Sequence, residues 1–245
     1  MRKQFLFLAI ISAILFSACK KSNDVLDTAT VSEYSPLVVG KYISYNLDST
    51  VFINFGAKDT IISYQVKHQI DAQITDNLGR PAYRITRYIR KTAANAWVPD
   101  NTFMAVPTDF TMEFIENNLR FLKLKGPIRN GYSWKGNSYI DTYSINSPVR
   151  YLADWDYTYD SVNVKQTIGA FTLDSTLKVA QRDEVIGNPA DPNSYHEINF
   201  GAEKYAKGIG LVYRKFLHVE YQPPTPGRGG YKQGYGVKLT MIDHN

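Results

Sequence analysis

The sequence predicts an all-β protein built on a single large curved antiparallel sheet, a half-barrel or open barrel with an irregular or short helical cover. Long segments alternate apolar and polar residues with period 2, and Gly, Asn and Pro residues separate them. No window combines ten or more residues at helical spacing with good caps. The 18 Tyr and 12 Phe residues, with frequent Val, Ile and Thr, also favour strands.

The start of the chain is typical of a secretory signal peptide, which we place at residues 1–18. Arg2 and Lys3 precede an apolar run over residues 5–16, and the small residues Ser17 and Ala18 follow it. A membrane-spanning helix needs about 20 apolar residues, so this run is too short to span a bilayer comfortably.

Cys19 follows this leader and is the only cysteine in the chain. A disulfide would need a second cysteine, and a catalytic thiol would need a basic partner in a shaped site. The sequence around Ser17, Ala18 and Cys19 resembles the lipobox of bacterial lipoproteins. The resemblance implies lipidation of the Cys19 thiol and cleavage just before it; the alternative is a cysteine discarded within a longer signal.

The rest of the chain divides into a tether and one domain. Residues 19–35 are polar and lack a sustained period, so we expect a flexible tether. Pro36 precedes the first strand pattern, and residues 36–245 are predicted to form the antiparallel β domain.

The clearest strand runs from Thr60 to Asp76. Its even-numbered residues from Ile62 to Ile74 are apolar except for Tyr64 and His68, and its odd-numbered residues are mostly polar. This predicts one buried and one wet face. We interpret His68 as a core histidine with one satisfied hydrogen bond. The turn at residues 76–80 then predicts a hairpin with residues 81–91.

Three further hairpins follow the same pattern. The first covers residues 110–125, with its turn at Asn117-Asn118, and the second joins residues 156–168 to 171–185 near Gly169. The last joins residues 210–222 to 235–245 through a Pro/Gly-rich stretch. Residues 90–110 look irregular, so we expect them to cover the apolar face of the sheet.

Two short stretches resemble Gram-negative outer-membrane lipoproteins. "SPLVVGKYISYNLDS" is similar to their "PL-x-x-G-x-W/Y-x-Y" opening, and "YAKGIGLVYRKF" is similar to their "YA-x-G-[VI]-G-L-V" signature. Domains with this signature often resemble the outer-membrane lipoprotein carrier fold, a half-barrel closed by helices. The resemblance implies a concave sheet that binds acyl chains.

Charge and location restrict the partners. The formal net charge is +5, and it becomes +3 once Arg2 and Lys3 leave with the signal peptide. This mild excess does not indicate a nucleic-acid partner. We expect a membrane partner through the N-terminal lipid and a location at the outer membrane, on either its periplasmic or its surface face. The oligomeric state is left open.

A search for catalytic motifs gives no constellation, so we expect no enzyme, no metal and no cofactor. The four histidines are far apart in sequence. His218 and Glu220 share a strand face, but two ligands do not make a metal site. Ser133, in "GYSWKG", lacks the spacing and the strand-to-helix context of a nucleophile elbow. The chain also lacks a complete phosphate-binding glycine motif.

Aromatic and basic residues supply the candidate ligand-binding positions. Tryptophans and tyrosines can stack on sugar rings, although packing within a sheet is the plainer interpretation. Arg87 lies out of phase with the neighbouring arginines, so it needs a carboxylate partner if it is buried. The candidates are Trp97, Trp134, Trp155, Arg87, Tyr231 and Tyr235.

Five Asp-Ser/Thr-x tripeptides resemble an O-glycosylation sequon of some Gram-negative bacteria. Residue frequencies predict roughly one such match by chance. The alternative is that Asp-Ser/Thr marks the exit from a turn into a strand. The candidate acceptors are Thr28, Ser49, Thr60, Ser161 and Ser175.

These patterns together favour a membrane-anchored binding or scaffold module for an apolar or amphipathic ligand. The first alternative is a surface glycan-binding lipoprotein that uses exposed Trp and Tyr. The second is an enzyme whose site has no recognised motif.

Overall fold

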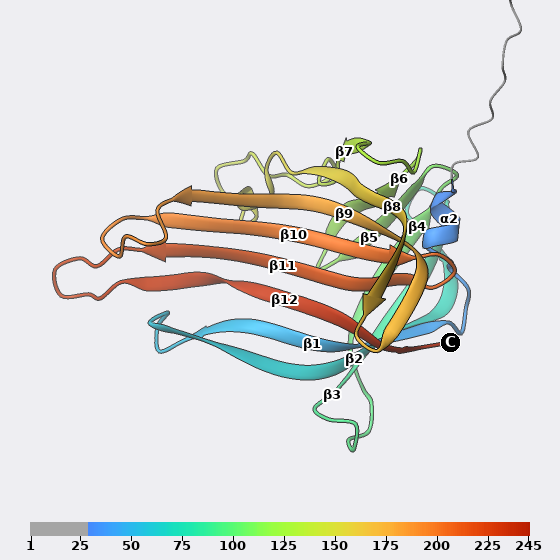
Figure 1. The fold of residues 1–245 in the computed structure, drawn as a ribbon, viewed down its shortest axis with the longest axis horizontal. Coiled ribbons are helices and arrows are strands. Elements are labelled where there is room, and N and C mark those ends of the chain that lie inside the picture. The colour runs from blue at the N-terminus through green and yellow to red at the C-terminus, as the bar shows by residue number, and fades with distance from the viewer. Residues whose placement is uncertain (1–28) are drawn as a thin grey trace, which may run out of the picture.

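The computed structural model describes residues 29–245, which form one antiparallel sheet of 12 strands (Figure 1). The predicted all-β class with a single large curved sheet is confirmed. The strands are β1 (Tyr42–Ile53), β2 (Lys58–Thr75), β3 (Pro81–Arg90), β4 (Val98–Pro107), β5 (Thr111–Glu116), β6 (Leu119–Lys125), β7 (Ser133–Lys135), β8 (Asp156–Ile168), β9 (Phe171–Gly187), β10 (His196–Ala206), β11 (Gly210–Gln222) and β12 (Tyr231–His244). Two short helical segments accompany them, α2 (Val31–Tyr34) and the 3-10 turn η1 (Arg150–Leu152).

Strands that are neighbours in the sequence also pair in the sheet, except at one break. The order is β6-β5-β4-β3-β2-β1-β12-β11-β10-β9-β8-β7, so β1 joins β12 and the two halves of the chain extend from that pair. The sheet curls until it is nearly closed, with one seam between its outer strands β6 and β7.

Individual contacts bridge this seam in place of a regular ladder. The Leu122 backbone N–H donates to the Gly136 carbonyl at 2.8 Å. The Trp134 indole N–H donates to the Leu122 carbonyl at 2.7 Å, and the Tyr159 hydroxyl donates to the Lys125 carbonyl at 3.0 Å. Side chains therefore satisfy edge groups of β6 that a sheet edge would otherwise leave open.

Strand register places the apolar faces inside the barrel. Ile70 lies opposite Ile85, Ile85 lies opposite Phe103, and all three are buried in one cluster. Directly opposed residues point to the same face, so this row continues across β2, β3 and β4. From Tyr64 to Ile70 the even-numbered residues of β2 face inward, as the alternation predicts. A register shift after Ile70 then pairs Ala72 with the exposed Arg84, so the predicted single face does not continue to Ile74.

Backbone conformation confirms two predicted turns. Asn117 and Asn118 both have positive φ, 51° and 62°, which is the left-handed region used by two-residue hairpins. Gly169 has a φ of 58° at the bend between β8 and β9. Asn and Gly tolerate this region better than other residues do.

The structure corrects two predictions about strands. Residues 98–107 form strand β4 between β3 and β5, although we expected the stretch 90–110 to be an irregular cover. Residues 196–206 form strand β10, for which no strand was predicted.

The predicted flexible tether, residues 19–35, also ends earlier than expected. Residues 29–35 belong to the fold, because Val31 and Tyr34 of α2 are buried and the Tyr34 hydroxyl lies 3.0 Å from the Ser175 hydroxyl. Thr30 and Glu33 form a capping box at the start of α2. Figure 1 shows α2 at the same end of the barrel as the C terminus. In the described part of the chain, no helix is long and apolar enough to cross a membrane.

Candidate functional site

A cavity of about 110 Å³ lies inside the barrel. Its walls are mainly aromatic and aliphatic. Ser35, Pro36 and Lys41 line it where the chain leaves α2, and these residues are half-buried, so the cavity reaches the surface at the α2 end. The apolar and aromatic wall residues include Tyr45, His68, Ile70, Ile85, Ala105, Met112, Phe114 and Leu239.

Two ion pairs form the inner end of this cavity. Lys123 of β6 donates to Glu203 of β10 at 2.6 Å, and both side chains are almost fully buried. Arg214 of β11 donates to both carboxylate oxygens of Glu116 of β5, at 2.6 and 2.8 Å. Each pair therefore joins one wall of the barrel to the other, and we call these four residues the interior ion network.

The interior ion network separates the cavity from a second, smaller one of about 30 Å³. Glu116, Lys123 and Arg214 line both cavities. The smaller cavity is also lined by Trp155 and Gln181, and the amide nitrogen of Gln181 is buried without a partner among the described residues. The charged groups thus interrupt an interior that is otherwise largely apolar.

Electrostatics holds the Glu116–Arg214 pair in its ionised form. Burial alone would raise the pKa of the Glu116 carboxyl, but the Arg214 guanidinium outweighs it and lowers the pKa to about 2. Burial and the Glu203 carboxylate raise the pKa of the Tyr205 hydroxyl well above its usual range. Tyr205 therefore stays protonated and donates to Glu203 at 2.8 Å.

His68 lies on the cavity wall between aromatic rings. Its ring centroid is 5.1 Å from that of Tyr45 and 5.2 Å from that of Phe103. The Nε2 atom is buried and has no hydrogen-bond partner in residues 29–245, so the predicted satisfied hydrogen bond is wrong. Burial lowers the pKa of His68 to about 3, and the nearby Arg87 contributes to this shift. The imidazole is therefore neutral at pH 7.

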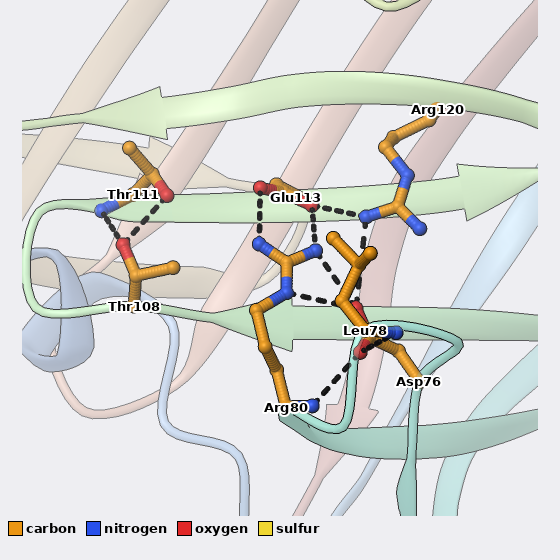
Figure 2. A network of polar contacts seen from close by, with 7 residues as sticks. All are labelled: Asp76, Leu78, Arg80, Thr108, Thr111, Glu113 and Arg120. Carbon is orange, nitrogen blue, oxygen red and sulfur yellow. Dashed lines mark hydrogen bonds and ion pairs between the residues drawn. The ribbon is translucent and has the colours of Figure 1, made fainter.

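A second polar network ties the turn after β2 to the outside of β5 and β6 (Figure 2). Arg80 donates to both oxygens of Glu113 at 3.0 and 3.1 Å, and its Nε donates to Asp76 at 2.9 Å. Arg120 also pairs with Glu113. Each charged side chain of this network has an oppositely charged partner within it, which favours a structural role.

The other end of the barrel carries a histidine with several acids. His218 is stacked on Tyr151 at 3.8 Å between centroids, and its Nδ1 lies 2.8 Å from the Asn199 side-chain oxygen. Glu220 lies 3.5 Å from His218 Nε2, so the two residues point together as their spacing suggests. Among residues 29–245, no group of three or more His, Cys, Asp or Glu residues is placed to hold a metal ion.

The structure does not bring the candidate ligand-binding residues together at one site. Trp134 and Trp155 are buried in the core, where Trp155 lies against Gly201 so closely that a Cβ there would be 2.7 Å from its ring. Trp97 is half-buried, and the Arg90 guanidinium lies 4.1 Å above its ring. These positions suit packing within the protein.

The remaining candidates have side chains that are half-buried or exposed. Arg87 faces inward beside His68 and has the carboxylate partner that its position predicts, Asp100. Tyr235 is exposed by 44%, and its hydroxyl lies 3.2 Å from that of Tyr151. The Arg228 guanidinium lies 3.8 Å from the centroid of the Tyr231 ring.

The candidate modification sites lie mostly within strands. Ser49, Ser161 and Ser175 are inside β1, β8 and β9, and only Thr60 lies near the start of a strand, β2. The alternative interpretation as turn exits therefore fails for the three serines. The Ser175 hydroxyl is also bonded to Asn163 and Tyr34. Cys19 and Thr28 lie outside the described residues.

Sequence reasoning did not single out the interior ion network. A signal was present, because Glu116 and Lys123 share the inward phase of Phe114 and Phe121 along β5 and β6. A charged residue in an apolar phase needs a buried partner. Comparisons of the chain with protein-family models, curated proteins and solved structures gave no match.

Proposed function

We propose that this protein is a membrane-anchored binding module that takes an apolar or amphipathic ligand into the cavity of its barrel. The observation that supports this is the cavity itself, an open apolar space whose inner end carries two ion pairs. Ligand sites are typically apolar pockets with a few placed polar groups, and this cavity has that composition.

The volume of the cavity limits what it can enclose. A cavity of about 150 Å³ holds one benzene molecule, and drug-sized ligands occupy about 300–1,000 Å³. At about 110 Å³ the cavity is smaller than the one that holds benzene, so it encloses only the end of a chain or one edge of a ring. The rest of a longer ligand would extend past Ser35 and Lys41 toward the end of the barrel that carries α2.

The membrane anchor in this proposal is a lipid on Cys19. The described chain begins at the α2 end of the barrel, where the cavity reaches the surface. An anchored chain would therefore hold the opening of the cavity near the bilayer. Two acyl chains give stable anchoring, whereas one chain gives only reversible binding. The lipobox resemblance implies the stable anchoring by two chains.

Mass spectrometry of protein purified gently from native envelopes tests both the bound ligand and the lipid anchor. We expect a non-covalent mass that remains on the folded chain and leaves it on denaturation. We also expect an N-terminal peptide that begins at an acylated Cys19. A folded chain that carries no bound mass would count against the ligand, and an unmodified Cys19 would count against the anchor.

A glycan-binding surface is the alternative function. It is favoured less, since Trp134 and Trp155 are only 5% and 2% exposed and cannot offer a flat platform to a sugar.

A further inference from the structure

We infer that the cavity selects an apolar molecule that carries one uncharged hydrogen-bond acceptor, such as the oxygen of a ketone, aldehyde or ester. This inference rests on the proposed function, because it concerns the same cavity. It follows from the charges and the unused hydrogen-bonding groups around the cavity.

The first argument is the charge of the inner end. Lys123 and Arg214 are balanced there by Glu116 and Glu203, so the network has no net charge. A carboxylate or ammonium ligand at this place would leave one buried charge without a counterion. An uncompensated buried charge is strongly unfavourable, whereas a neutral polar group needs only a hydrogen bond.

The second argument is the balance between donors and acceptors. Each of the four carboxylate oxygens already accepts a hydrogen bond: those of Glu116 from Arg214, and those of Glu203 from Lys123 and Tyr205. The Lys123 ammonium has three N–H groups, and Glu203 is its only hydrogen-bond partner among residues 29–245.

Part of the unused hydrogen-bonding capacity of Lys123 is directed toward an aromatic ring. The Lys123 nitrogen lies 4.7 Å from the centroid of the Phe121 ring. The side chain is only 5% exposed, so bulk water does not satisfy the remaining N–H. The unused group at the inner end of the cavity is thus a donor, which an acceptor on the ligand would complement.

His68 adds a second unused polar atom on the wall. Its buried Nε2 has no partner, and the neutral ring can place its N–H on this nitrogen. His68 lines the same cavity as Lys123, so both groups face a single ligand. The surrounding side chains of Ile70, Ile85 and Leu239 offer only apolar surface.

Calorimetric titration of the folded chain with four six-membered-ring probes tests the inference. The probes are methylcyclohexane, cyclohexanone, cyclohexanecarboxylate and cyclohexylammonium at pH 7. We expect cyclohexanone to bind at least about tenfold more tightly than methylcyclohexane, since a hydrogen bond from a charged donor has about that effect. Both charged probes should bind at least about tenfold more weakly than cyclohexanone.

A double variant, Lys123→Met with Glu203→Gln, removes the donor and its counterion together. His68 remains as a donor in this variant, so the preference for cyclohexanone over methylcyclohexane should fall at least about threefold without vanishing, while methylcyclohexane binds as before. The wild-type series is sufficient by itself if the double variant does not fold.

The outcomes separate the two proposals. Equal binding of cyclohexanone and methylcyclohexane would overturn the inference and leave the proposed function standing. Tightest binding of the carboxylate or the ammonium probe would also overturn it, as would a ketone preference that is undiminished in the double variant. If neither neutral probe binds, the proposed function fails together with the inference.

Discussion

His68 is buried in the barrel at an energetic cost, because its Nε2 lacks a hydrogen bond. A buried polar atom without a partner typically destabilises a protein by about 1–3 kcal/mol. The aromatic contacts with Tyr45 and Phe103 leave this atom without a hydrogen bond. A ligand that bonds to His68 would remove the penalty, which is consistent with a role in binding.

The lowered pKa of His68 predicts a pH-dependent stability. The pKa is about 3 in the folded chain and about 6.5 in the unfolded chain. As the pH falls below 6.5, the unfolded state binds a proton that the folded state refuses. The free energy of unfolding therefore falls by up to about 1.4 kcal/mol per pH unit from this residue.

His68→Phe should flatten this dependence between pH 6.5 and pH 4.5. Below that window the loss of the Glu116 charge adds its own destabilisation, since its pKa rises from about 2 to its ordinary value on unfolding. Urea unfolding of both proteins at pH 7.5, 6 and 5 measures the difference. Parallel curves for variant and wild type would show that His68 does not resist protonation.

At the residue scale, alternation along a strand predicts which face of the sheet a side chain lies on, but not which groups it contacts. The period-2 pattern places His68 inside the sheet correctly. Its surroundings could not be predicted, because the side chains around it come from β1, β3 and β4. The pairs Lys123–Glu203 and Arg214–Glu116 likewise join residues 80 and 98 positions apart.

At the scale of elements, the turn between β2 and β3 is fastened to β5 by Arg80. This guanidinium bridges Asp76 and Glu113, and the Glu113 side chain is only 3% exposed (Figure 2). Removal of one partner of a buried ion pair leaves an uncompensated charge. The next arginine in the chain, Arg84 of β3, makes a much more exposed pair with Asp71.

Arg80→Met should therefore destabilise the protein by about 2 kcal/mol, less than a fully buried pair because Arg80 is itself 30% exposed. Arg84→Met is the matched control and should have a much smaller effect, since exposed ion pairs contribute little. Urea unfolding at pH 7 measures both. Equal losses in the two variants would mean that the turn is not fastened through Arg80.

The hairpins were predictable because each combines alternation with a clear turn. Strand β4 was missed because Pro99 and Pro107 interrupt its pattern, and proline argues against a central strand. Strand β10 was missed because Gly201 breaks its apolar face. The barrel places Trp155 against that glycine, a contact with no local signal in the sequence.

At the scale of the whole molecule, the pairing of β1 with β12 turns two runs of hairpins into one barrel. That contact joins residues about 200 positions apart, such as Leu47 and Leu239. Sequence patterns give the strands and favour a curved sheet, but they do not give this closure or the position of the seam. The cavity and the interior ion network exist only because the sheet closes.

Methyl NMR of the titrated protein tests most directly whether a ligand enters this interior. With a small ketone, the methyl signals of Ile70, Ile85 and Met112 should shift to saturation, while those of the exposed Ile61 and Ile145 stay in place. Ala105→Phe should abolish the shifts by filling the cavity, and Ala57→Phe, at an exposed turn, should not. Shifts confined to Ile61 and Ile145, or shifts that persist in a folded Ala105→Phe variant, would contradict binding inside the barrel.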